Sequence, residues 1–425
     1  MILVLCLWLI LLLGGTPLYI SLGIASIMYI FSQGLQPLII PQKVAMAADS
    51  FPLLAAPFFI LMGNIMNHSG VTQRIFRFST TLVGWIRGGL GHANIIASLI
   101  FAGMSGAAVA DAGGLGTIEI EAMRNAGYDD DFSCAITAAS STVGPIIPPS
   151  LPMVILGVSA STSIGGLFIG GILPGLLMAG SLMLLVHFLA KKRGYPKGKF
   201  PSVRGVWQSF LSAFWALLAP LILLFGILSG MFTPTEAAVV AALYALILGI
   251  FVYKEFRISD LPQMIITTVE TSGVVMALVM TAVLFGWNLT VGQLPQRLGK
   301  MLMGLSDNPI VILLIINLFL LFVGCFMEAI AAMIILIPVF LPVIDALGIN
   351  HIQFGLIMIL NLMIGTITPP VGVVLGVTAN IAHVPFERVT RATLPFLLPL
   401  LIVLLLITVI PELTTFLPNV LMGIK

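Results

Sequence analysis

The stretch Gly144-Pro145-Ile146-Ile147-Pro148-Pro149 has a counterpart 221 residues later, Gly365-Thr366-Ile367-Thr368-Pro369-Pro370. The first proline of each pair lies 45 residues after a polar, glycine-containing interruption, which begins at Gly103 in one half and at Gly324 in the other. Because the spacing between the two interruptions is the same in both halves, the sequence predicts an internal duplication. In a membrane protein, paired interruptions of this kind point to a transport site.

Composition places the chain in a lipid membrane. Of its 425 residues, 59% are hydrophobic and 8% are charged, and the mean hydropathy is +1.17. So few charges cannot cover a soluble core, and the chain is predicted to be an all-α polytopic membrane protein. Cys6, Cys134 and Cys325 lie in apolar runs without metal-ligand or disulfide spacing, and we interpret them as small hydrophobic residues.

The duplication predicts two inverted-topology repeats, residues 1–204 and 205–425. Each is expected to contain scaffold helices, a surface arm, a re-entrant helical hairpin, a broken transmembrane helix and a closing helix. In the first repeat these segments are 1–67, 71–87, 88–124, 132–159 and 167–190. In the second repeat they are 205–287, 291–308, 309–346, 352–383 and 391–412. Both arms are amphipathic and carry Arg or Lys, which is typical of a helix along the membrane surface.

Local sequence supports these segments. Thr16-Pro17 and Thr233-Pro234 each interrupt an apolar run, and in both the threonine is expected to cap a helix that the proline opens. Neither limb around Gly103-Met104-Ser105-Gly106 is a full-length span, so a re-entrant tip fits better than a crossing. The prolines between Pro145 and Pro149 remove backbone donors, so nearby carbonyl groups lose their helical partners.

The positive charges predict the orientation. Lys191-Lys192-Arg193 is the densest basic cluster, and the positive-inside bias assigns it to the cytoplasm. Counting crossings from there puts Lys254 and Arg257 in the cytoplasm and both termini on the periplasmic side. Arg297 and Lys300 fall outside, against the bias.

Where the hairpin tips meet the broken helices, two clusters of oxygen-bearing groups are expected near the bilayer midplane. Sodium is a hard cation that prefers oxygen ligands, and free carbonyls and short hydroxyl side chains supply them. The candidates in the first half are Gly103, Ser105, Gly106, Ser141, Thr142, Gly144 and Pro145; in the second half they are Gly324, Met327, Glu328, Gly365, Thr366 and Thr368. The competing interpretation is that these small residues only permit close helix packing.

Carboxylates inside apolar runs are functional candidates by default. Asp111 and Glu328 follow the two tips and either tune cation binding or cap the returning limb. Glu119 and Glu121 are expected to form a solvated helix end, and Glu236 to interact with the first turn of its helix.

Several motifs resemble the large membrane subunit of tripartite ATP-independent periplasmic (TRAP) transporters. They are Gly103–Asp111, Met123–Tyr128, Gly144–Ser150, Phe232–Ala238 and Gly365–Gly372, and the resemblance runs over nearly the whole chain. One departure is Glu328, where the family commonly has Asp; the carboxylate is retained.

The resemblance implies a sodium-coupled secondary importer of the elevator type in the bacterial inner membrane, with at least two sodium ions. It implies a periplasmic binding protein that delivers an organic acid, such as sialic acid or a C4-dicarboxylate, and a separate small membrane subunit of four helices. Substrate is expected between the two sodium clusters, near Ser105, Ser140, Ser141 and Asn361. We expect no nucleic-acid partner.

Two other functions stay open from the residues alone. A stand-alone exchanger of ions or anions has the same fold and needs no binding protein. An intramembrane enzyme or assembly scaffold is the third, because Gly103-Met104-Ser105-Gly106 is similar to the exposed serine of an intramembrane protease. No histidine is spaced to activate Ser105, and no phosphate-binding loop is present, so we expect neither catalysis nor ATP hydrolysis.

Overall fold

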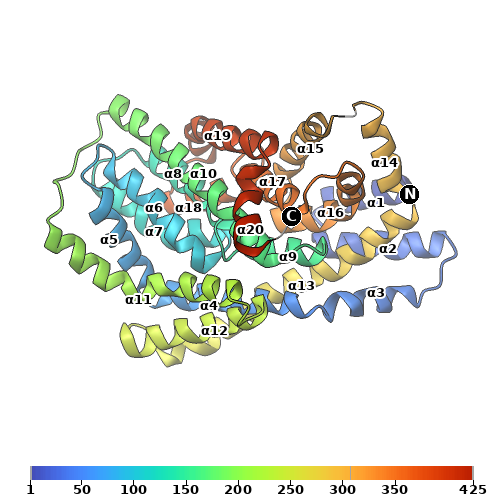
Figure 1. Ribbon diagram of the computed structural model, residues 1–425, viewed down its shortest axis with the longest axis horizontal. Helices are drawn as coiled ribbons and strands as arrows, with labels where there is room; N and C mark the ends of the chain where they lie inside the picture. Colours follow the sequence, from blue (N-terminus) through green and yellow to red (C-terminus); the bar gives the residue numbers. More distant parts are fainter. Residues whose placement is uncertain (1, 307, 424–425) are drawn as a thin grey trace.

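The computed structural model describes residues 2–306 and 308–423, apart from the side chains of residues 2, 3, 13, 105 and 303. Within this part the chain is helical, and its only extended pairing is an isolated bridge between Arg87 and Lys197 (Figure 1). Seven of the described helices are long and apolar enough to cross a membrane, or eight if α8 and α9 count as one bent span. The predicted class, an all-α polytopic membrane protein of inverted repeats, is confirmed.

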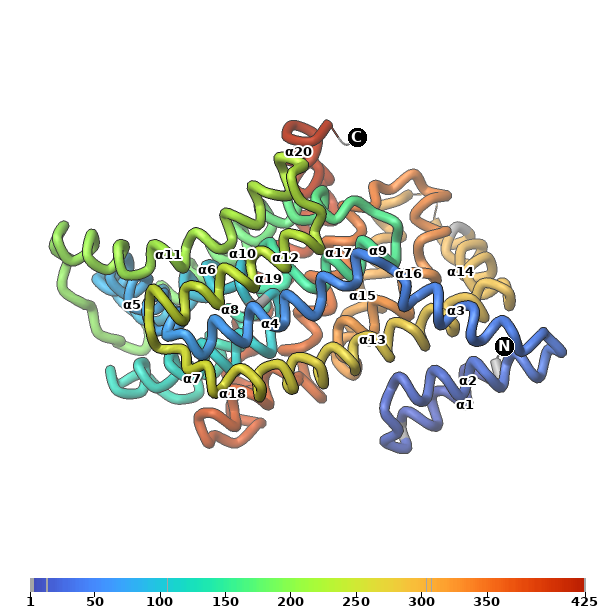
Figure 2. The backbone as a smooth tube through the Cα atoms, turned by 90° about the horizontal axis from the view of Figure 1, so that it is seen from below, coloured from blue at the N-terminus to red at the C-terminus, as the bar shows by residue number. Residues whose placement is uncertain are grey.

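The helices predicted to form the scaffold in the two repeats pack against each other. In the first repeat they are α1 (Ile2–Leu13), α2 (Leu18–Ser32), α3 (Ile39–Ala48), the 3-10 turn Phe51–Leu54 and α4 (Ala55–His68). In the second they are α11 (Val203–Leu228), α12 (Pro234–Ile247), the π-helical turn Leu248–Val252, the 3-10 turn Ile258–Asp260 and α13 (Leu261–Val291). Helix α4 packs on α12 and α13, and α2 packs on α13, so neither half is a separate scaffold (Figure 2).

The arms, hairpins and broken helices follow in the same order in both halves. The first half has α5 (Val71–Val83), α6 (Gly89–Ser105), α7 (Ala108–Asn125), α8 (Asp130–Ser141), the 3-10 turn η2 (Gly144–Ile146), α9 (Leu151–Ser159) and α10 (Ile164–Arg193). The second has α14 (Leu294–Met303), α15 (Pro309–Gly324), α16 (Ala329–Ala346), α17 (His351–Gly365), α18 (Val373–Ala382), α19 (Phe386–Val409) and α20 (Glu412–Met422). In Figure 1 the first hairpin, α6 and α7, lies to the left of α17, and the second, α15 and α16, lies to its right.

Two helix starts were predicted from Thr-Pro, and one prediction is wrong. The Thr233 hydroxyl accepts a hydrogen bond from the Glu236 N–H, and the Glu236 carboxylate accepts one from the Thr233 N–H at 2.8 Å, which makes a capping box. Thr16 caps nothing, because α2 begins at Leu18 without a side-chain cap. The Thr16 N–H instead donates to the Leu11 carbonyl at 3.1 Å and so closes the preceding helix. Helix α3 was not predicted.

Candidate functional site

The first hairpin tip touches the first diproline break. Helix α6 ends at Ser105, Gly106 takes a left-handed φ of +60°, and α7 starts two residues later. A Cβ atom on Gly106 would lie 3.1 Å from both the Pro149 carbonyl oxygen and the Leu151 nitrogen. The positive φ and this close backbone approach both favour glycine. The side chain of Ser105 lies outside the described part, so its predicted roles stay predictions.

The second tip touches the second break more tightly. A Cβ atom on Gly365 would lie 2.5 Å from the Gly324 Cα atom and 2.7 Å from its carbonyl oxygen, so the two backbones are in direct contact. The Val371 N–H donates to the Cys325 carbonyl at 3.4 Å. Each break also contains one cis peptide bond, Pro148-Pro149 in the first and Pro369-Pro370 in the second.

The two broken helices are neighbours. The segment Asp130–Ile146, which contains α8 and η2, meets α9 at a bend of 43°. Turn η2 packs on α17, and α9 packs on α16 and α17. A Cβ atom on Gly355 of α17 would lie 2.7 Å from the Leu156 side chain of α9. Both helix interruptions predicted from the diproline stretches therefore exist, and each repeat contributes a broken helix to one central region.

Four candidate hydroxyls share one geometry. Each donates its proton to a carbonyl of α8 or α17 three or four residues earlier: Ser141 to Ala138 at 2.9 Å, Thr142 to Ala139 at 2.7 Å, Thr366 to Met363 at 2.6 Å and Thr368 to Ile364 at 2.7 Å. A hydroxyl that donates in this way keeps its oxygen lone pairs free to coordinate a cation. Neutral oxygens of this kind are suitable ligands for a sodium ion. The Pro145 carbonyl, a further candidate, accepts from the Ser150 hydroxyl at 2.6 Å.

Comparison with known proteins decides the family. Residues 5–413 match the family described as the tripartite ATP-independent periplasmic transporter, DctM component. The chain belongs to this TRAP transporter family. It is 48% identical to the large permease protein SiaM of the sialic acid TRAP transporter of Vibrio cholerae, over 98% of each chain.

Other relatives share the TRAP assignment. The chain is 45% identical to the sialic acid TRAP transporter permease protein SiaT of Haemophilus influenzae, over 97% of this chain and 67% of that one. It is 40% identical to the C4-dicarboxylate TRAP transporter large permease protein DctM of Pseudomonas aeruginosa, over 89% and 88% of the two chains. The solved structure of the Alcanivorax borkumensis YdaH transporter matches with a TM-score of 0.58 at 18% identity, covering 83% of this chain and 85% of that chain, which shows a shared fold.

One substrate candidate of this TRAP permease belongs to a buried polar network. The Asn94 amide donates to the Glu119 carboxylate at 2.6 Å and to the Thr137 hydroxyl at 2.8 Å, and it accepts from the Ser140 hydroxyl at 2.6 Å. Ser98 donates to Ser140 at 3.1 Å. The network joins α6, α7 and α8, so Ser140 is part of the contact between the hairpin and the broken helix.

The prediction for Glu119 is wrong. Its side chain is fully buried, and it does not form a solvated helix end. Its partner Asn94 comes from the other limb of the hairpin, so the sequence of α7 alone gave no reason to expect burial. The polar Asn94 inside an apolar run was the one available signal, because buried amides need partners. Glu121 is exposed, as expected.

Asn361, the substrate candidate of the second repeat, bonds to a neighbouring helix. Its amide donates to the Asn317 carbonyl at 3.1 Å and to the Asn317 side-chain oxygen at 3.0 Å, which ties α17 to α15. Its own side-chain oxygen is buried and accepts no hydrogen bond from the described residues. Asn361 therefore forms hydrogen bonds between two helices, and its side-chain oxygen remains available as an acceptor.

The two carboxylates that follow the tips differ. Glu328 caps α16, because its carboxylate accepts from the Ala331 N–H at 3.0 Å. Asp111 lies in the first turn of α7 and is 1% exposed, and its carboxylate accepts no backbone N–H within the described residues. Glu328 therefore takes the capping role, Asp111 caps no helix end within the described residues, and cation binding by either carboxylate stays a prediction. The Met327 side chain lines an apolar cavity of about 710 Å³.

Proposed function

We propose that this permease imports an organic acid of the sialic acid or C4-dicarboxylate type, driven by sodium. The relatives named above transport such acids by name, and the chain aligns with one of them from end to end. We further propose that it works in the bacterial inner membrane with a small membrane subunit of four helices and a periplasmic binding protein, with both termini periplasmic. These partners follow from the tripartite family.

One observation carries the proposal: each hairpin tip contacts the diproline break of its own repeat. Gly106 meets Pro149 in the first repeat, and Gly324 meets Gly365 in the second. In each repeat, the end of a hairpin helix therefore lies against the unwound backbone of the break, and neutral hydroxyl and carbonyl oxygens lie beside this contact. Such paired sites bind sodium and an anionic substrate in secondary transporters. In the proposed elevator mechanism, the hairpins and broken helices move together against the scaffold.

The test is uptake into proteoliposomes that contain this chain and the small subunit, with the binding protein added outside. An inward sodium gradient is expected to drive accumulation of the acid, and replacing it with potassium is expected to abolish accumulation. Accumulation that persists in potassium would show that sodium coupling is wrong. Uptake without any binding protein would favour the stand-alone exchanger.

Variants locate the cation ligands. Thr142→Val and Thr366→Val remove a hydroxyl at constant shape, and each is expected to raise the sodium concentration for half-maximal uptake at least several-fold. Thr393→Val is the control, because Thr393 is also buried and donates to a carbonyl of its own helix, Val389, at 2.9 Å. Equal sodium dependence in all three variants would remove these hydroxyls from the sodium sites.

A further inference from the structure

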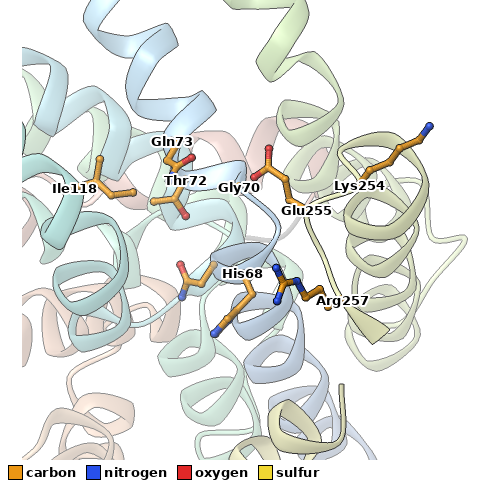
Figure 3. Close-up of a pocket in the computed structure, with 9 residues that line it drawn as sticks. His68, Gly70, Thr72, Gln73, Ile118, Lys254, Glu255 and Arg257 are labelled. Carbon is orange, nitrogen blue, oxygen red and sulfur yellow. The ribbon is translucent and has the colours of Figure 1, made fainter. Parts of the chain in front are cut away.

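A polar pocket of about 490 Å³ lies where the scaffold meets the first hairpin (Figure 3). Its walls come from the junction of α4 and α5, from the connector after α12, and from Ile118 of α7. None of the residues that line it belongs to either hairpin tip or to a diproline break. The pocket is therefore separate from the proposed transport site.

The pocket has an unpaired cation and an unpaired buried hydroxyl. The Arg257 guanidinium is directed toward His68 (Figure 3), and it makes no ion pair with any described residue. The one carboxylate of the wall, Glu255, is already paired with Arg74 at 2.6 Å. Thr72 also lines the pocket; it is 2% exposed, and its hydroxyl has no hydrogen-bond partner in the described part.

The other polar groups agree with an anionic ligand. Asn67 lines the pocket, and its side-chain oxygen, which faces Gly114 of α7, lacks a hydrogen-bond partner in the described part. His68 has one ring nitrogen 2.9 Å from the Asn64 carbonyl, which leaves the other nitrogen free for the pocket. Lys254 is directed away from the cavity (Figure 3) and adds only long-range charge. An unpaired guanidinium beside several unpaired polar groups is suited to phosphate or carboxylate.

Exposed apolar side chains flank the pocket residues along the chain and indicate where the anion comes from. Phe251, in the π-helical turn after α12, is 69% exposed, and Ile258, directly after Arg257, is 67% exposed. Exposed apolar groups next to a cation are typical of the membrane interface, where acyl chains and headgroups meet. The charge bias puts Lys254 and Arg257 on the cytoplasmic side. Basic pockets between helices on that side bind anionic lipid headgroups.

We propose that this pocket binds the phosphate headgroup of an anionic phospholipid of the cytoplasmic leaflet. Arg257 and Thr72 contact the phosphate, and Phe251 and Ile258 contact the acyl chains. Because Ile118 belongs to the first hairpin and the other walls to the arm and scaffold, the bound lipid touches both parts. Its occupancy therefore couples membrane composition to the movement of the hairpin.

The experiment measures lipid binding to the full chain in detergent by native mass spectrometry, with phosphatidylglycerol as probe and phosphatidylcholine as reference. Arg257→Ala is expected to weaken phosphatidylglycerol binding about five-fold, the factor that one interfacial cation contributes. Thr72→Val is expected to weaken it less, and Arg257→Lys and Thr72→Ser to retain most of it. Phosphatidylcholine binding is expected to stay unchanged.

Arg77→Ala is the matched control. Arg77 is an exposed cation of α5, the helix that also carries Thr72, and it does not line the pocket. If Arg77→Ala weakens binding as much as Arg257→Ala, the effect is general surface charge and the proposal is overturned. Millimolar inorganic phosphate that displaces the lipid completely would instead identify a site for soluble anions. Size-exclusion elution like that of the unmodified chain establishes that each variant is folded.

Discussion

Gly365→Ala tests whether the contact between tip and break is needed for transport. The new methyl group would lie 2.5 Å from the Gly324 Cα and carbonyl carbon atoms, whereas ordinary contacts begin at 3.4 Å. All three atoms it meets belong to the backbone of Gly324, so no flexible side chain can yield. The second tip must therefore move from its break by about 1 Å, at a cost of about 1–3 kcal/mol for overpacking.

Transport is expected to suffer more than folding. Ligand constellations need positioning to within about 0.5 Å, so a shift of about 1 Å disrupts a cation site formed between tip and break. Sodium-driven uptake in proteoliposomes is expected to fall at least tenfold. The thermal unfolding midpoint in detergent is expected to fall by only a few degrees, consistent with the overpacking cost.

The control is the equivalent glycine of the first repeat. Gly144 is buried like Gly365, but a Cβ atom there has nothing within 4 Å. Gly144→Ala also keeps the backbone carbonyl through which Gly144 is a candidate sodium ligand, so it is expected to keep both uptake and the unfolding midpoint near those of the unmodified protein. Equal activity of the two variants, or an unaffected Gly365→Ala, would refute the argument that backbone contact makes the site.

Three further predictions concern stability, each followed by thermal unfolding of the full chain in detergent. Asn94→Leu removes the only hydrogen-bond donor that the described residues offer to the buried Glu119 carboxylate. It should destabilise the protein by about 2–3 kcal/mol, because an unpaired buried acceptor is costly; an unchanged midpoint would contradict this. Thr233→Ala breaks the capping box and should cost about 1 kcal/mol. A hydrogen bond from Tyr195 lowers the pKa of Asp129. The ionised Asp129 therefore stabilises the folded state above about pH 4, and this stabilisation is lost as the pH falls further. Asp129→Asn should therefore flatten the acid side of the stability profile, and an equally steep profile would refute this.

The sequence alone determined what depends on neighbours along the chain. Proline removes its own N–H and constrains the residue before it, so the two broken helices follow from the diproline stretches wherever they sit in the fold. The capping box of Thr233 and Glu236 likewise needs residues only three positions apart. The order of hairpins and breaks could be predicted because the chain repeats it.

Only the tertiary structure decided what depends on a second segment. Glu119 is buried because Asn94 reaches it from the other limb of the hairpin. Gly144 and Gly365 occupy the same position in their repeats, but only Gly144 has room for a side chain. The reason is that Gly365 faces another backbone within van der Waals contact, whereas Gly144 does not. The duplicated sequence specifies the same local geometry twice, whereas packing against different neighbours makes the two copies physically distinct.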